Sequence, residues 1–228
     1  MAKILENRDL GKNFFLIKID QGGQANPGQF YMLSPSDQSL LLPRPISIFD
    51  QDEKSTSFLI ANVGKGTEDF QKMLVGQEIH IEGPYGNGFP KPKEKKTYLV
   101  GGGTGIAPFY HMLSVWNQED FQLAIGLREE NLELEKLFHK KFPQTKFVYG
   151  GYVTDYISFE EHDQVYTCGP KAMMEAVYKK AQDKEVYISL EERMGCGFGA
   201  CLACTCQTAS GRKKTCKDGP VFKGEEIL

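Results

Sequence analysis

Four cysteines in the last third of the chain follow the spacing Cys196-x4-Cys201-x2-Cys204-x11-Cys216. The first three have the x4, x2 spacing of plant-type 2Fe-2S ferredoxins, in which one loop supplies three thiolates and another segment supplies the fourth. Glycines at positions 195, 197 and 199 allow this loop to turn tightly and to point backbone amides at an anionic centre. The pattern predicts a 2Fe-2S cluster bound by Cys196, Cys201, Cys204 and Cys216.

Two other uses of these cysteines remain open. A disulfide framework needs an oxidising compartment. The first ten residues are charged and carry no apolar signal-peptide core, so we expect a cytoplasmic protein in which disulfides are rare. A structural zinc site of four cysteines is the stronger alternative, although such sites more often use paired Cys-x2-Cys knuckles. We expect Cys206 to lie outside the ligand set.

Composition narrows the classes of protein that the chain can belong to. It has 228 residues, of which 40% are hydrophobic, which is enough for two modest domains. The formal net charge of -3 gives no electrostatic reason to expect a nucleic-acid partner. No stretch is long and apolar enough to predict a membrane span.

About 90 residues at the N-terminal end alternate short apolar runs with turn-forming residues such as Gly22-Gly23 and Asn26-Pro27-Gly28. Five or six short strands separated by such turns predict a small antiparallel barrel, interrupted by one helix. The expected strands are residues 13–19, 29–34, 46–50, 57–63 and 78–82, and the expected helix is 68–74.

After the lysine-rich stretch 90–96, the pattern changes to strand, glycine loop and helix, which predicts a parallel α/β sheet. The expected strands are 97–100, 121–126, 146–149, 164–168 and 186–190, and the expected helices are 109–116, 132–141 and 171–182. We therefore expect a β-barrel in residues 1–92, an α/β domain in 93–190 and a small cluster-binding segment in 191–228.

Two loops follow strands of the predicted α/β sheet. The first is the glycine-rich stretch 101–105, and the second is Cys168-Gly169-Pro170. Ligands of open α/β sheets bind at the carboxyl ends of the strands, so both loops are expected to border one crevice. The first loop does not follow the G-x-G-x-x-G spacing, and an ordinary turn between strand and helix explains it equally well. A cysteine such as Cys168 is more often a small buried residue than a functional one.

The predicted barrel carries two stretches suited to anions. Arg44-Pro45-Ile46-Ser47 combines a cation and a hydroxyl around a restrained turn. Gly64-Lys65-Gly66-Thr67 offers free amides and a threonine N-cap at the start of the expected helix. Either stretch alone fits an ordinary surface, but together they predict a phosphate-bearing cofactor.

Taken in order, these stretches resemble the ferredoxin reductase superfamily, in which an N-terminal barrel holds FAD and an α/β domain holds NAD(P)H. Within it, the chain is most similar to the electron-transfer subunits of type B dihydroorotate dehydrogenases, and the match covers essentially the whole chain. The supporting stretches are Arg44-Pro45-Ile46-Ser47, residues 63–67, 83–90 and 99–108, Cys168-Gly169-Pro170, and residues 191–222.

The resemblance implies the residues that hold each cofactor. FAD is expected against Arg44, Pro45, Ile46, Ser47, Ile60, Ala61, Asn62, Gly66 and Thr67. NAD(H) is expected against Gly102, Gly103, Thr104, Gly105, Cys168, Gly169 and Pro170, with Cys168 near the nicotinamide. The chain departs from the superfamily pattern at Ala61-Asn62, where Tyr-Arg is common, and after Tyr149, where the glycine-bearing loop is short.

The resemblance also implies an electron relay. A hydride donor gives two electrons at once and an iron-sulfur cluster accepts one, so a flavin must lie between them. The expected partner is an FMN-containing dihydroorotate dehydrogenase catalytic subunit, in a heterotetramer with two copies of each chain, and the physiological flow runs from dihydroorotate to NAD+ in pyrimidine biosynthesis. The cluster is expected at an exposed surface that docks on this partner.

Two further points stay open at the sequence level. Glu129 and Glu130, after the second α/β strand, favour NADH because carboxylates repel a 2'-phosphate, whereas the neighbouring Arg128 favours the phosphate. The alternative functions are a stand-alone NAD(P)H-dependent flavin iron-sulfur reductase that serves another acceptor, and a zinc-binding interaction module.

Overall fold

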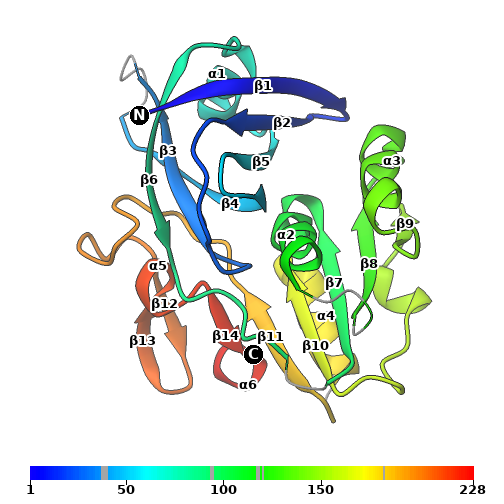
Figure 1. Ribbon diagram of the computed structural model, residues 1–228. Helices are drawn as coiled ribbons and strands as arrows, with labels where there is room; N and C mark the ends of the chain where they lie inside the picture. Colours follow the sequence, from blue (N-terminus) through cyan, green and yellow to red (C-terminus); the bar gives the residue numbers. More distant parts are fainter. Residues whose placement is uncertain (37–40, 93–94, 117–118, 120, 182) are drawn as a thin grey trace.

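Six strands close into an antiparallel barrel in the order β1-β2-β5-β4-β3-β6 (Figure 1). The computed structural model describes residues 1–36, 41–92, 95–116, 119, 121–181 and 183–228. The barrel elements are β1 (Ala2–Gly11), β2 (Phe14–Ile19), β3 (Phe30–Pro35), β4 (Arg44–Gln51), β5 (Thr56–Ala61), α1 (Lys65–Lys72) and β6 (Glu78–Tyr85).

The barrel strands bury side chains on both of their faces. Phe15, Ile17 and Ile19 fill the barrel interior, whereas Leu16 of the same strand packs outward against the α/β domain. This explains why β2 and β5 are almost continuously apolar. Strand β1 was not among the expected strands, since charged residues occupy most of its exposed positions and mask the buried Ala2 and Ile4.

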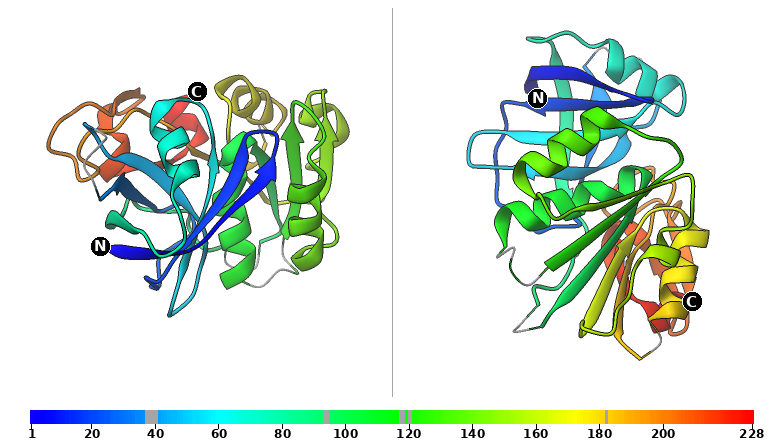
Figure 2. Two further views of the ribbon diagram at one scale, coloured as in Figure 1. Left: turned by 90° about the horizontal axis from the view of Figure 1, so that it is seen from above. Right: turned by 90° about the vertical axis from the view of Figure 1, so that its right-hand side faces the viewer.

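The α/β domain contains a six-stranded sheet in the order β14-β11-β10-β7-β8-β9. Its parallel strands are β7 (Thr97–Gly102), β8 (Phe121–Leu127), β9 (Lys146–Tyr149), β10 (Gln164–Cys168) and β11 (Glu185–Ser189). Its helical elements are η1 (Gly103–Ile106), α2 (Ala107–Val115), α3 (Leu132–Lys141), η3 (Val153–Tyr156) and α4 (Lys171–Lys180). Helices α2 and α3 cover the sheet face toward the barrel and α4 covers the opposite face (Figure 2).

These elements match the expected strands and helices closely, with boundaries shifted by a few residues. Gln182, the expected end of the last helix, and residues 93 and 94, where the domain boundary was placed, lie outside the described residues. No helix in the described ranges is long and apolar enough to cross a membrane.

The C-terminal segment forms a hairpin and then returns to the α/β sheet. The hairpin is β12 (Thr205–Thr208) and β13 (Gly211–Lys214), followed by α5 (Thr215–Asp218), β14 (Val221–Lys223) and α6 (Gly224–Ile227). Strand β14 pairs antiparallel with β11 at the edge of the sheet. The tail after the last cysteine is therefore an integral strand of the α/β domain, which the sequence analysis did not anticipate.

Candidate functional site

A cleft of about 680 Å³ opens between the barrel, the carboxyl edge of the parallel sheet and the segment that leads to the cysteines. It brings together residues more than a hundred positions apart in the chain. Its lining includes Arg44, Pro45, Ile46, Ser47, Ile60, Ala61 and Thr67 from the barrel, Thr104 and Cys168 from the sheet loops, and Ser189 to Met194. Most of the residues expected to bind FAD therefore share one cleft.

Gly66, at the start of α1, leaves the space that the Arg44 guanidinium occupies. A Cβ at position 66 would stand 2.7 Å from Arg44 Nε and 2.8 Å from Nη2. The guanidinium also donates to the carbonyl oxygen of Leu42 at 2.6 Å. Since the first amides of a helix have no partner within the helix, α1 and Arg44 together present donors to an anion.

Asn62 and Thr67 form hydrogen bonds that shape the junction of β5 and α1. Asn62 does not line the cleft; its amide donates to Gln71 Oε1 at 2.7 Å and so ties the end of β5 to α1. Thr67 is the third residue of α1, and its hydroxyl accepts from the amides of Val63 and Gly64. The expectation that Thr67 is the N-cap is wrong, because Gly64 occupies that position.

The two glycine-bearing loops of the sheet pack directly against each other. A Cβ on Gly105 would lie 2.4 Å from the carbonyl oxygen of Cys168, and one on Gly169 would lie 2.7 Å from that of Gly102. A side chain at either position would clash with the backbone of the other loop, so the packing of the two loops requires both glycines. Gly103 has a φ of +57° and open space at its Cβ position, so it and Thr104 are the accessible part of the first loop.

Two titratable groups in the cleft have raised pKa values. Burial raises the pKa of the Cys168 thiol far above its ordinary value, so the thiol stays protonated. Glu191 keeps contact with solvent in the cleft, yet the surrounding walls displace water from its carboxyl group and raise its pKa. Glu191 was not among the expected site residues, because no local pattern shows that it lies in a cleft.

The four predicted ligand cysteines lie in two pairs. The thiols of Cys196 and Cys201 are within hydrogen-bonding reach of each other, as are those of Cys204 and Cys216. In the described ranges, no three His, Cys, Asp or Glu side chains converge as the ligands of a single metal ion do. Two pairs of thiols fit a two-iron centre, in which each iron needs two protein ligands.

The two cysteine pairs differ in their surroundings. Cys201 is exposed and Cys196 is half-buried, whereas Cys204 and Cys216 are only 2% and 1% exposed. Desolvation opposes ionisation of Cys196, but hydrogen bonds from Cys201 and from the amides of Phe198 and Ala200 outweigh it and lower its pKa to about 6. Burial and the adjacent Cys204 raise the pKa of Cys216 to about 12, so a metal ion bound there would have to displace the proton of the Cys216 thiol.

We call the buried residues Cys204 and Cys216 the inner cysteine pair. This pair and the cleft share a wall. Met194 and Phe30 line the cleft, and both also pack in the apolar cluster that contains Cys204 and Cys216. Gly197 fits the cysteine loop onto the barrel, since a Cβ there would stand 2.6 Å from Met32 and 2.8 Å from Tyr85. A group bound in the cleft and a group bound by the cysteines are thus separated by a layer of packed side chains.

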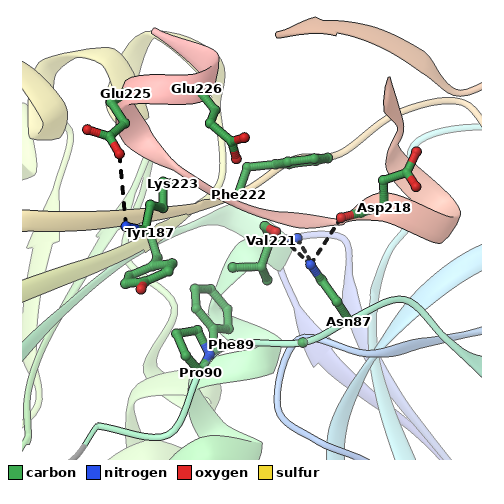
Figure 3. A pocket seen from close by; sticks show the side chains of 11 residues that line it. Asn87, Phe89, Pro90, Tyr187, Asp218, Val221, Phe222, Lys223, Glu225 and Glu226 are labelled. Carbon is green, nitrogen blue, oxygen red and sulfur yellow. Dashed lines mark hydrogen bonds and ion pairs between the residues drawn. The ribbon is translucent and has the colours of Figure 1, made fainter. Parts of the chain in front are cut away.

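A second cavity, of about 580 Å³, lies beside the tail (Figure 3). Phe89, Pro90 and Val221 are among its apolar lining residues, and Glu225 and Glu226 are among its charged ones. Asn87 fastens the tail here: its Nδ2 donates to the carbonyl oxygens of Val221 at 2.9 Å and Asp218 at 3.1 Å, and its Oδ1 accepts from the Val221 amide at 3.2 Å. The stretch 83–90 therefore positions the segment that carries Cys216.

Comparisons with known proteins agree with this arrangement. Residues 191–228 match the model of the iron-sulfur cluster binding domain of dihydroorotate dehydrogenase B. The dihydroorotate dehydrogenase B (NAD(+)) electron transfer subunit of Clostridium acetobutylicum is 39% identical over 238 residues, which cover 100% of this chain and 96% of that protein. The corresponding subunit of Listeria welshimeri is 40% identical over 221 residues, with 89% and 87% covered.

Solved structures show the same fold. An NADH-dependent reduced ferredoxin-NADP oxidoreductase studied for flavin-based electron bifurcation superposes with a TM-score of 0.87 at 25% identity, covering 100% of this chain and 90% of that one. A ferredoxin NADP+ reductase from Neisseria gonorrhoeae, solved with bound FAD and NADP, has a TM-score of 0.63 at 17% identity, covering 80% and 89%. The barrel, the α/β sheet and the cysteine segment, together with full-length relatives near 40% identity, show that the chain belongs to the family of electron-transfer subunits of NAD+-dependent dihydroorotate dehydrogenase B.

Proposed function

We propose that this chain carries electrons between NAD(H) and a catalytic subunit that oxidises dihydroorotate to orotate in pyrimidine biosynthesis, with FAD and a 2Fe-2S cluster as its cofactors. The observation that carries the proposal is the shared wall of Phe30 and Met194 between the cleft and the buried cysteine pair. It places a cofactor-sized cavity in contact with a four-thiol site. When bound, the flavin exchanges electron pairs with a nicotinamide and single electrons with an iron-sulfur centre.

The barrel residues bind and orient the flavin. Arg44 and the free amides at the start of α1 would hold the diphosphate of FAD, and the cleft-lining residues Pro45, Ile46, Ser47, Ile60, Ala61 and Thr67 would enclose the rest of the cofactor. Gly66 contributes by leaving room for the Arg44 guanidinium. Asn62 supports the site indirectly through its bond to Gln71.

The sheet loops provide the side from which a nicotinamide approaches. Thr104 and Cys168 face the cleft, Gly103 leaves space for a phosphate, and Gly102, Gly105, Gly169 and Pro170 set the close packing of the two loops. Burial raises the pKa of the Cys168 thiol, so this thiol would not act as a base. The carboxylate of Glu130 supports a preference for NADH because it repels a 2'-phosphate, whereas the charge of Glu129 is offset by Lys12 at 2.8 Å.

The cysteine segment holds the cluster and delivers electrons outward. Cys204 and Cys216 would hold one iron of the cluster, and Cys196 and Cys201 would hold the other. The expected partner is the FMN-containing catalytic subunit, with two copies of each chain in a cytoplasmic heterotetramer. The alternative is a stand-alone reductase with another acceptor, which the same internal geometry would also serve.

Spectroscopy and co-purification test the proposal. The purified protein is expected to show flavin and iron-sulfur absorption, to contain one FAD and two irons per chain, and to give an EPR signal of a reduced 2Fe-2S centre after addition of NADH. Zinc without iron would contradict the cluster assignment. Co-expression with a dihydroorotate dehydrogenase catalytic subunit should yield a stable complex that reduces NAD+ with dihydroorotate. A coloured, NADH-reducible chain that never associates with that subunit would support the stand-alone reductase instead.

A further inference from the structure

The hydroxyl of Thr215 is a buried polar group without a hydrogen-bond partner. Thr215 is 0% exposed, and its Oγ1 is one of four buried side-chain atoms in the described part of the chain that form no hydrogen bond. The other three belong to His111, His162 and Thr167. A buried donor without a partner is costly, so such a group in a native fold needs a physical reason. Thr215 differs from the other three residues because it directly precedes the predicted ligand Cys216.

The hairpin places the Thr215 side chain on the same side as the Cys204 thiol. The paired residues of β12 and β13 begin with Thr205 opposite Lys214. The Thr215 amide extends this ladder by one pair, since it donates to the carbonyl oxygen of Cys204 at 3.0 Å. Side chains of directly opposed residues in an antiparallel pair lie on one face. A hydrogen bond and the strand register therefore place Thr215 beside the inner cysteine pair.

The usual acceptors of a threonine hydroxyl do not serve Thr215. Within a helix, this hydroxyl commonly bonds to the carbonyl oxygen three or four residues earlier. Thr215 is the first residue of α5, so no turn of that helix precedes it. The carboxylate of Asp218, at the other end of α5, accepts the backbone amide of Lys214 at 2.7 Å. The Thr215 hydroxyl therefore keeps a proton that it can donate to a group bound by the cysteines.

Backbone amides already donate to sulfur atoms in both cysteine pairs. The amide of Ala200 donates to Cys196 Sγ at 3.3 Å, and the amide of Cys216 donates to Cys204 Sγ at 3.4 Å. A bound 2Fe-2S cluster adds two inorganic sulfides to the four cysteine sulfurs, and hydrogen bonds to these sulfurs help to set its reduction potential. Thr215 offers a side-chain donor in the same surroundings.

We propose that the Thr215 hydroxyl donates a hydrogen bond to a sulfur of the 2Fe-2S cluster and raises the reduction potential of the cluster. The inference rests on the proposed function, because it takes the four cysteines as cluster ligands, and it adds a residue that tunes the electron relay. Reduction adds one electron and hence one negative charge, and hydrogen bonds to anionic acceptors are stronger than those to neutral ones. The hydroxyl keeps its proton throughout, so no covalent bond changes.

A buried water molecule is the competing partner for this hydroxyl. Such waters commonly satisfy buried polar groups, and each needs two to four polar neighbours. If Thr215 were bonded only to water, loss of the hydroxyl would leave the cluster potential unchanged. If Thr215 is bonded to a cluster sulfur, loss of the hydroxyl lowers the potential. Measurement of the potential therefore separates the two partners.

The test is a redox titration of the holo chain with dithionite, followed by the EPR signal of the reduced cluster. Thr215→Val keeps the shape of the side chain and removes the hydroxyl. We expect the equilibrium constant for cluster reduction to fall about 10-fold, which is about 59 mV for a one-electron couple. Thr215→Ala, a second variant without a hydroxyl, should show a similar fall. Thr215→Ser retains the hydroxyl and should stay within about 2-fold of the unmodified chain.

Thr167→Val is the matched control, because it removes another buried hydroxyl without a partner, on β10 of the α/β sheet. Its cluster potential should stay within about 2-fold of that of the unmodified chain, expressed as the equilibrium constant. Resonance Raman spectra in H2O and D2O give a second measurement. The Fe–S stretching bands should lose part of their deuterium shift in Thr215→Val and keep it in Thr215→Ser.

Iron content and visible absorption establish equal cluster loading in the compared proteins. Equal potentials in the unmodified chain and the two hydroxyl-free variants, or an equal fall in Thr167→Val, would overturn the role of Thr215 and leave the proposed function intact. A fall in Thr215→Ser as large as that in Thr215→Val would also overturn it. If the unmodified chain binds no iron, the proposed function itself fails.

Discussion

At the scale of single residues, Gly66 leaves the space that the Arg44 guanidinium occupies beside the proposed flavin site. A methyl group at position 66 would overlap the guanidinium, whose Nε lies 2.7 Å from the Cβ position. We expect Gly66→Ala to weaken FAD binding about 10-fold, or about 1.4 kcal/mol, measured by titrating the FAD-depleted protein with FAD and following flavin fluorescence. Gly64→Ala is the control, because nothing lies within 4 Å of its Cβ and its backbone is extended. Equal affinities in both variants would show that Arg44 does not contact the FAD phosphates.

Asn87 is the second residue with a testable structural role. Three hydrogen bonds join its amide group to the backbone of the tail. Asn87→Ala should lower the free energy of unfolding by about 2 to 3 kcal/mol, since it leaves partly buried backbone groups without partners. Chemical denaturation measures this loss. Gln122→Ala, at an exposed position, should have little effect. If Asn87→Ala and the control are equally stable, the tail is held by other contacts.

At the scale of elements, the segment 191–195 links the cleft to the inner cysteine pair. Met194 separates the cleft from Cys204 and Cys216. Truncation in Met194→Ala should admit water and oxygen to the inner iron and accelerate the loss of cluster absorbance in air roughly five-fold. Met194→Leu keeps the volume and should behave like the unmodified protein. Equal rates of loss in all three proteins would mean that Met194 does not protect the cluster.

How far the sequence predicts these elements depends on the range of the interactions that form them. The α/β strands were predicted well because their apolar runs are flanked by glycine loops, and Arg44 to Ser47 could be assigned to a common site from local motifs. Strand β1 could not be predicted, since its burial depends on pairing with β2 and β6. The tail that follows Cys216 is fastened by Asn87, which is 131 positions from Asp218. Interactions of that range leave no periodic pattern in the sequence.

At the scale of the whole molecule, the barrel and the α/β domain share one apolar core. Phe49 of β4 stacks on Tyr110 of α2 with 4.0 Å between the ring centroids. Lys141 of α3 bridges the domains through Asp50 at 3.3 Å and Ser114 at 2.6 Å. The two walls of the cofactor cleft are therefore fixed relative to each other by packing, and the stability of this interface affects the geometry of the cleft.

His111 makes that interface sensitive to acid. Its ring is buried, with Nε2 bonded to the carbonyl oxygen of Ala25 at 3.0 Å and Nδ1 without a partner. Burial lowers its pKa below the ordinary value of 6.5; the bond to Ala25 and the charge of Asp50 oppose this shift, and Lys141 adds to it. Because the unfolded chain then binds the proton more readily, the stabilisation is complete above pH 6.5 and is lost as the pH falls from 6.5 through the folded-state pKa.

We therefore expect the free energy of unfolding of the holoprotein to decrease between pH 7.5 and pH 5.5, and His111→Gln to reduce that decrease. Chemical denaturation at the two pH values measures the difference for each protein. His162 is also buried with a lowered pKa, so His162→Gln is the control: it should remove its own contribution and leave that of His111. The double variant should then show the smallest dependence on pH, since sites in separate parts of the core contribute additively. If His111→Gln keeps the full pH dependence of the unmodified protein, the acid sensitivity arises elsewhere than at the domain interface.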